Sequence, residues 1–195
     1  MSVFGMYLQL GFEHIIDIKG YDHILFIMTL CAVYLFTDWR HITVLVTAFT
    51  IGHSITLALA TLHILRIKPQ LVEFLIPLTI FITAVENIVM KRTDFSPTLY
   101  RMKYLSALFF GLIHGMGFSN YLRSLLGEQE SIVKPLFAFN VGLEIGQLIV
   151  VTCILILATF FVKFLKAPKR EWSLVLSGAG LGVSIILMIE RSGLV

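Results

Sequence analysis

Histidines and acidic residues recur within the apolar stretches of this chain. In chain order, four such stretches hold Asp22 and His23, His53, His114, and Glu144. Ionisable side chains are costly inside a membrane and usually serve a function there. Neutral imidazoles combined with a carboxylate form the ligand set of Zn, Ni, Co and Fe(II) sites. We therefore predict that these residues bind a divalent transition-metal ion, provided that the fold brings their helices together.

Polar residues close to these groups are candidates for orienting the ligands. Thr50 lies three positions before His53, while Asn140 and Gln147 lie four before and three after Glu144. On a helix, these spacings place side chains on the same face. Hydrogen bonds from such neighbours orient metal ligands, so we predict supporting roles for Thr50, Asn140 and Gln147. The alternative is that they only bond to a neighbouring helix and hold the bundle together.

Two further groups lie outside this set. His14 precedes the first long apolar run, and we expect it to join Asp22 and His23 where an ion enters. Glu86 and Asn87 lie near the end of the third run. They are either a second site, on the side where an ion would leave, or a polar helix end that reaches out of the membrane.

The composition is that of an integral membrane protein. Hydrophobic residues make up 57% of the 195 residues, charged residues make up 14%, and the mean hydropathy is +0.90. Soluble domains carry about 25% charged residues. The net charge of +3 does not indicate a nucleic-acid partner. No nucleotide-binding P-loop is visible, so we expect no ATP site in this chain.

Six stretches are long and apolar enough to span a membrane, which takes about 20 residues. They are 22–37, 41–62, 69–90, 101–123, 132–162 and 172–190. Residues 1–18 carry too many ionisable groups for a span, and their apolar spacing predicts a helix in the membrane interface. We therefore expect one all-α domain over 1–195, a polytopic membrane bundle of about six helices (19–195) preceded by an interfacial or lid segment (1–18). Glycine pairs four residues apart predict close helix packing, and they are Gly111 and Gly115, Gly142 and Gly146, and Gly178 and Gly182.

The distribution of basic residues predicts the orientation. The loops after the first, third and fifth stretches carry nine of the 15 Lys and Arg residues. Cytoplasmic loops carry such an excess, so both termini are expected on the outer side. With a rise of about 1.5 Å per residue, His23, His53 and His114 then lie in the outer half of the membrane and Glu144 near its middle. A metal site shared by four helices would be open to the outer side.

Four sequence motifs resemble those of a known family. They are "HIIDIKGYDHILF", "TAFTIGHSITLALA", "FGLIHGMGFS" and "FNVGLEIGQ", in this order over roughly residues 10–150. They are similar to the HupE/UreJ family of hydrogenase- and urease-associated membrane proteins. The resemblance implies a small multi-pass permease for nickel or cobalt in the inner membrane of a bacterium.

The family's site residues can be placed on this sequence by the same resemblance. Its His and Asp-His motif falls on His14, Asp22 and His23, with seven residues instead of five between the first two. Its His-Gly motif falls on His114 and the glycine after it. Classical members carry a Glu a few residues later, which is absent here, and the resemblance to the "GLEIGQ" branch implies that Glu144 replaces it.

Three functions are compatible with these observations. We favour a transition-metal permease, a transporter and not an enzyme, for an ion such as Ni, Co, Zn or Fe. The alternative is a membrane-embedded metalloenzyme, a hydrolase or oxidoreductase that acts on a lipid-soluble substrate through the same metal. A scaffold subunit with structural histidines is the third. The expected partners are the metal ion and the lipid bilayer, and a homo-oligomer is left open.

Overall fold

The chain folds into α-helices, as the sequence predicts. The computed structural model describes residues 2–18, 20–90, 97–126 and 132–193, and no strand occurs among them. The α-helices are α1 (Val3–Ile16), α2 (Asp22–Cys31), α3 (Trp39–Thr61), α4 (Pro69–Val89), α5 (Pro97–Gly117), α6 (Ser119–Leu126), α7 (Val133–Thr159) and α8 (Lys169–Arg191). A short 3₁₀ helix, η1 (Phe36–Asp38), precedes α3, and a π-helical turn, η2 (Phe160–Phe164), extends α7.

Four helical segments in the described part of the chain have the length and apolarity of a membrane span. They are α3 with η1, α4, α7 with η2, and α8, with 26, 21, 32 and 23 residues. Each is therefore about 30 Å long or longer, which matches the hydrocarbon layer of a bilayer. They correspond to the predicted spans 41–62, 69–90, 132–162 and 172–190, and they support the prediction of a membrane protein.

The first predicted span, 22–37, is not a continuous helix. α2 ends at Cys31 after ten residues, so it is only about 15 Å long and cannot cross the bilayer alone. The chain then turns, and Val33 and Tyr34 in this turn are 4% and 1% exposed. Other parts of the protein cover these two side chains, and this burial accounts for their hydrophobic character. Hydropathy cannot distinguish such burial from contact with lipid, which is why the prediction of one long helix was wrong.

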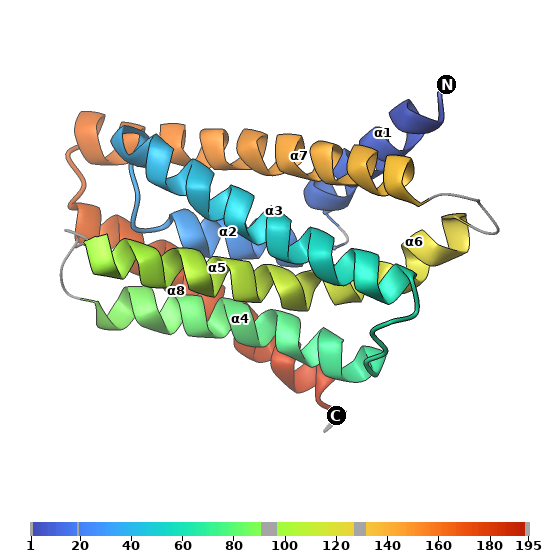
Figure 1. Cartoon of the computed structure of the whole chain (residues 1–195). Helices are drawn as coiled ribbons and strands as arrows, with labels where there is room; N and C mark the ends of the chain where they lie inside the picture. Colours follow the sequence, from blue (N-terminus) through green and yellow to red (C-terminus); the bar gives the residue numbers. More distant parts are fainter. Residues whose placement is uncertain (1, 19, 91–96, 127–131, 194–195) are drawn as a thin grey trace.

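α1 and α2 are two short helices separated by a break. In Figure 1, α1 starts at the end of the bundle where both termini lie and stops partway along it, and α2 continues toward the opposite end. His14 lies in the last turn of α1, and His23 is the second residue of α2. The break therefore brings together two of the predicted ligands.

Paired glycines hold α1 against α7. A Cβ atom at Gly11 would overlap the carbonyl group of Phe139, and one at Gly142 would overlap the carbonyl group of Leu8. Because neither residue has a Cβ, the two backbones can touch. Ile15, in the last turn of α1, is fully buried. α1 is thus part of the bundle, and its location in the membrane interface stays a prediction.

Two glycines of α5 likewise allow its backbone to pack closely against that of α3. A Cβ at Gly111 would overlap the Phe49 carbonyl, and one at Gly115 would overlap the His53 carbonyl. His114 immediately precedes the second of these glycines. This contact therefore fixes the position of His114 along the axis of α5 relative to His53 on α3.

The third predicted glycine pair is different. No atom of the described residues lies within 4 Å of a Cβ built at Gly178 or Gly182. The prediction of close packing for this pair was wrong within the chain, since both glycines lie on a face of α8 that no other helix covers. Gly180, between them, instead lies against the Thr29 side chain of α2.

The long described helices have their ends at two opposite ends of the bundle. Figure 1 shows both termini toward one end of the bundle, with the start of α3, the end of α4 and the start of α8 at the other. The first turns of α3 and α8 carry Arg40, Lys169 and Arg170. The assignment of this second end to the cytoplasm stays a prediction.

Candidate metal site

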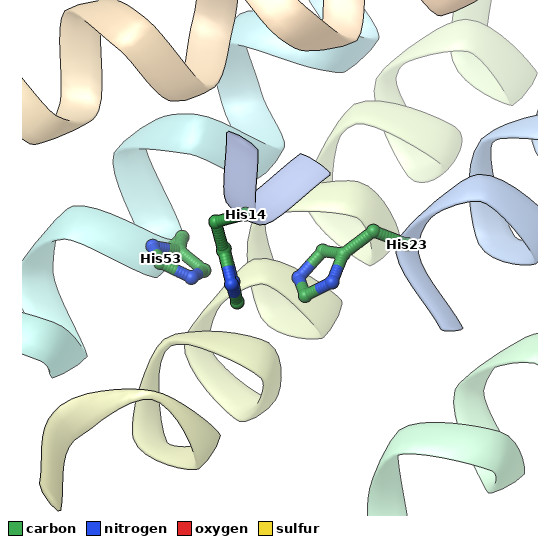
Figure 2. A group of neighbouring side chains, drawn as sticks. All are labelled: His14, His23 and His53. Atoms are coloured by element: carbon green, nitrogen blue, oxygen red, sulfur yellow. The ribbon is translucent and has the colours of Figure 1, made fainter. Parts of the chain in front are cut away.

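Three histidines from three helices meet at the break between α1 and α2. One ring nitrogen of each of His14, His23 and His53 lies within 4.8 Å of the other two. Figure 2 shows His14 between the other two, with the ring of His23 directed toward it. Nitrogen ligands of a tetrahedral zinc ion are about 3.3 Å apart, given Zn–N bonds of about 2.05 Å. Small side-chain rotations would therefore let all three bind one ion.

Each histidine of this trio has at least one buried ring nitrogen without a hydrogen-bond partner in the described part of the chain. The unpaired buried atoms are Nε2 of His14, Nε2 of His23 and both nitrogens of His53. An unsatisfied buried polar group costs about 1–3 kcal/mol, so three such rings at one point are unfavourable for stability alone. A shared cation would use these lone pairs, and neutral imidazole is a common metal ligand. The donor set therefore fits a transition-metal ion.

His114 adds a fourth imidazole to the trio. Its ring centroid lies 5.2 Å from that of His23, and its Nε2 lies 3.0 Å from the Thr79 hydroxyl of α4. That hydroxyl donates its single hydrogen to the Ile76 carbonyl at 2.7 Å, so it must accept from the Nε2–H group of His114. The neutral ring then carries its lone pair on Nδ1, which is buried and unpaired among the described residues. Thr79 thus presets the His114 tautomer for metal binding through Nδ1.

Phenylalanine rings enclose the histidines. The pairs, with the distances between ring centroids, are Phe118 with His14 (4.1 Å), Phe139 with His53 (6.3 Å), Phe49 with His114 (5.1 Å) and Phe26 with His114 (5.2 Å). These walls keep other polar partners away from the imidazoles. They also provide a low-dielectric setting in which metal–ligand interactions are strong. The sequence did not predict these four residues, because nothing in it separates them from phenylalanines that face lipid.

Two cavities reach the histidines. One, of about 290 Å³, is lined by three histidines and four charged residues, which are His14, His23, His114, Asp17, Asp22, Glu73 and Arg191. The second, of about 700 Å³, is lined by His14, Phe118 and Tyr121 together with Glu13 and Asp17. Carboxylates at both openings would attract a divalent cation. We call the first of these cavities the acidic vestibule.

Asp22 lies beside the histidines but is paired with another residue. Its two carboxylate oxygens accept hydrogen bonds from Nη2 of Arg191, at 3.2 Å and 2.9 Å. Arg191 is the last residue of α8. The sequence prediction included Asp22 as a ligand and did not anticipate this ion pair, because 169 residues separate its partners.

Glu144 is not grouped with the histidine trio. Its Oε1 accepts a hydrogen bond from the Thr47 hydroxyl at 2.7 Å. Thr47 precedes His53 by six residues on α3, which is about 9 Å along the helix axis. The structure therefore brings together His14, His23, His53 and His114, and it places the Glu144 carboxylate next to Thr47, toward the other end of α3.

Of the predicted supporting residues, Thr50 and Gln147 connect two helices, and Asn140 bonds within its own helix. The Thr50 hydroxyl donates to Oε1 of Gln147 at 2.8 Å, which ties α3 to α7 one turn from His53. Asn140 donates to the Leu136 carbonyl of its own helix at 2.9 Å. Both interactions hold side chains in place close to the site. Contact of Thr50, Asn140 or Gln147 with a ligand of the metal stays a prediction.

The predicted inner pair has partners of its own. Nδ2 of Asn87 donates to the Thr29 carbonyl at 2.8 Å, near the end of α2. Glu86 forms an ion pair with Lys103 of α5, with 3.8 Å between the charged atoms. Both residues therefore help to hold α4 against its neighbours, and a role in releasing an ion stays a prediction.

Comparison with known proteins extends the sequence resemblance to nearly the whole chain. The family model described as "HupE / UreJ protein" matches residues 1–191. No curated protein and no solved structure matches the chain. The match covers all four histidines of the site as well as Asp22, Glu144 and Arg191. The chain therefore belongs to the HupE / UreJ family of membrane proteins.

Proposed function

We propose that this protein is a permease for a divalent transition-metal ion. The observation that carries the proposal is the trio of His14, His23 and His53. One ring nitrogen of each lies within 4.8 Å of the other two, and each ring has a buried nitrogen that is unpaired among the described residues. Imidazole nitrogen favours ions such as Ni²⁺, Co²⁺ and Zn²⁺ over Mg²⁺ and Ca²⁺, which prefer oxygen. The sequence motifs imply an association of the family with hydrogenase and urease. This association supports nickel or cobalt as the transported ion.

The membrane arrangement follows from the helix pattern. α1 and α2, with 14 and 10 residues, together amount to about 36 Å of helix, enough for one pass across a bilayer. If this composite pass replaces the predicted interfacial segment 1–18 and the predicted span 22–37, α3, α4, α5, α7 and α8 would bring the number of passes to six. Both termini then lie on the same side, which we assign to the outer face of a bacterial inner membrane. Broken helices of this kind form ion sites in other transporters.

The ion would cross in steps. It would enter through the acidic vestibule and lose water as the imidazoles replace it. Glu144 of α7 is the next carboxylate that could receive it. Its partner Thr47 lies about 9 Å from His53 along the axis of α3. Glu86 and Asn87, near the far end of α4, would serve release. Several moderate sites allow an ion to leave, whereas one very tight site would trap it.

Uptake by proteoliposomes tests the proposal directly. Purified protein reconstituted into liposomes should take up Ni²⁺ or Co²⁺, and His53→Asn should abolish most of that uptake. His63→Asn is the matched control, because His63 is exposed at the end of α3 and its backbone has a positive φ of 61°, which asparagine tolerates. Absence of uptake of Ni²⁺, Co²⁺, Zn²⁺ and Fe²⁺ by folded wild-type protein would refute the permease.

A metalloenzyme is the second candidate, and one observation favours it. Phe26 and Phe49 are each 1% exposed and stack at 5.0 Å between ring centroids, and both rings lie against His114. They present an apolar barrier beside the imidazoles, as expected for a site that retains its ion. Metal that stays bound at one equivalent after prolonged washing with a chelator, in protein that shows no uptake, would favour this alternative.

A further inference from the structure

Arg191 reaches from the end of α8 to two other helices. Nη2 binds both carboxylate oxygens of Asp22 at the start of α2, and Nη1 donates to the Glu73 carbonyl of α4 at 3.3 Å. The two charged side chains are 26% and 16% exposed. Arg191 thus lines the acidic vestibule together with its carboxylates and its histidines.

The position of this guanidinium is built into the fold. Pro77 lies within α4 and has no N–H group, so the carbonyl four residues earlier, that of Glu73, lacks its helical partner. Arg191 supplies a donor for that carbonyl. On the same helix, Gly180 lies directly against Thr29 of α2, which fixes α8 relative to the helix that carries Asp22.

The pairing bears on which cations Asp22 can bind. Mg²⁺ and Ca²⁺ bind carboxylate oxygen and have little preference for imidazole. A vestibule that contains Asp17, Asp22 and Glu73 without a countercharge would collect them, since they are the hard oxygen-binding divalent ions. An arginine that already occupies both oxygens of Asp22 removes the carboxylate closest to the histidines from this competition.

We propose that Arg191 is a selectivity residue, whose guanidinium occupies the Asp22 carboxylate and leaves the adjacent imidazoles to bind the ion. The proposal rests on the permease function and specifies how its site chooses ions. A transition-metal ion binds the ring nitrogens of His23 and its neighbours while the guanidinium stays on Asp22. Mg²⁺, which prefers oxygen, must displace the guanidinium to bind this carboxylate. The ion pair is partly exposed, so the cost of displacing it is modest.

Competition between ions tests this assignment. Binding of Ni²⁺ to purified protein in lipid nanodiscs would be titrated with Mg²⁺ as the competitor. Arg191→Gln should lower the Mg²⁺ concentration that halves Ni²⁺ binding by about 1.5-fold to fivefold, the range expected for loss of one partly exposed ion pair. Ni²⁺ binding without Mg²⁺ should become tighter or stay unchanged. Unchanged competition by Mg²⁺ in the variant would overturn the proposal.

Three further variants separate selectivity from a structural role. In the double variant Asp22→Asn/Arg191→Gln, the Mg²⁺ concentration that halves Ni²⁺ binding should return toward the wild-type value, because the carboxylate that binds Mg²⁺ is gone. Arg191→Lys, which keeps the charge, should restore most of the wild-type selectivity. Lys169→Gln, which breaks an ion pair of 3.9 Å with Asp38 at the other end of α8, should have no effect. If Arg191→Gln only weakens Ni²⁺ binding, the residue has a structural role and the proposal is wrong.

The result of the Mg²⁺ competition experiment can be distinguished from the result of the uptake experiment that tests the permease. The binding titration does not depend on uptake, so it reports on Arg191 even in protein that does not transport. Failure of wild-type protein to take up any of the four ions would refute the permease alone. Equal Mg²⁺ competition in wild type and Arg191→Gln would refute the role of Arg191 alone.

Discussion

Thr79 and His114 form a hydrogen bond whose direction a third group decides. The Thr79 hydroxyl donates to the Ile76 carbonyl at 2.7 Å and therefore accepts from Nε2–H of His114 at 3.0 Å. The lone pair of the neutral ring is thus on Nδ1. A residue on α4 that touches no other member of the histidine cluster in the described structure thereby controls which nitrogen His114 offers to an ion.

Replacing Thr79 should weaken metal binding without removing a ligand. Thr79→Val keeps the shape of the side chain but removes the acceptor, so His114 loses its fixed tautomer. Loss of such a hydrogen bond to a ligand typically costs about 10–100-fold in affinity, and we expect the Kd for Ni²⁺ to rise within this range. Calorimetric titration of the nanodisc-embedded protein would measure it. Thr79→Ser, which retains the hydroxyl, should bind nearly as tightly as wild type, and equal affinity for the Val variant would contradict the assigned tautomer.

Metal binding should stabilise the fold through the histidine trio. A ligand that binds only the folded state at a concentration of about 100 Kd adds about 2.7 kcal/mol to the free energy of unfolding. Thermal unfolding in detergent should therefore shift upward by several degrees with Ni²⁺. The shift should vanish in His53→Asn and persist in His63→Asn, the exposed control. A shift of the same size in both variants would place the ion elsewhere.

Gly111 should be essential for the packing of α3 on α5. Gly111→Ala places a Cβ where the Phe49 carbonyl lies, and such overpacking costs about 1–3 kcal/mol. Gly182→Ala is the matched control, since nothing lies within 4 Å of its Cβ in the described part of the chain and alanine favours helix by about 1 kcal/mol over glycine. The melting temperature should fall for the first variant and hold or rise for the second. A stable Gly111→Ala protein would show that this contact can relax.

Glu144 should matter for transport more than for binding. Its carboxylate is bonded to Thr47, away from the histidine trio, so Glu144→Gln should leave the Kd for Ni²⁺ within about twofold of wild type. Uptake should fall by at least about tenfold if the ion passes this carboxylate on its way inward. Binding and uptake would be measured on the same preparation. A large loss of affinity would instead make Glu144 a direct ligand of the ion.

Local features explain what could be predicted and what could not. Hydropathy correctly indicated four of the six predicted spans, because each lies on a long, predominantly apolar helix. The predicted span 101–123 is not among the candidate spans of the described residues, and it crosses the end of α5 at Gly117. Hydropathy failed at 22–37, where Val33 and Tyr34 are apolar but lie under other helices. Glycine spacing correctly indicated the close contacts at Gly111 and Gly142 and failed at Gly178, because spacing alone does not tell which face of a helix meets a neighbour.

The amino-acid sequence by itself indicated the class of molecule, the four histidines, and the acidic residue Asp22 beside them. It did so because hydropathy and ligand chemistry are properties of single residues and short segments. Only the tertiary structure decided that His14 joins His23 across a helix break, that Glu144 pairs with Thr47, and that Arg191 holds Asp22. These relationships depend on where helices cross and how side chains rotate, and neither is encoded in the order of neighbouring residues.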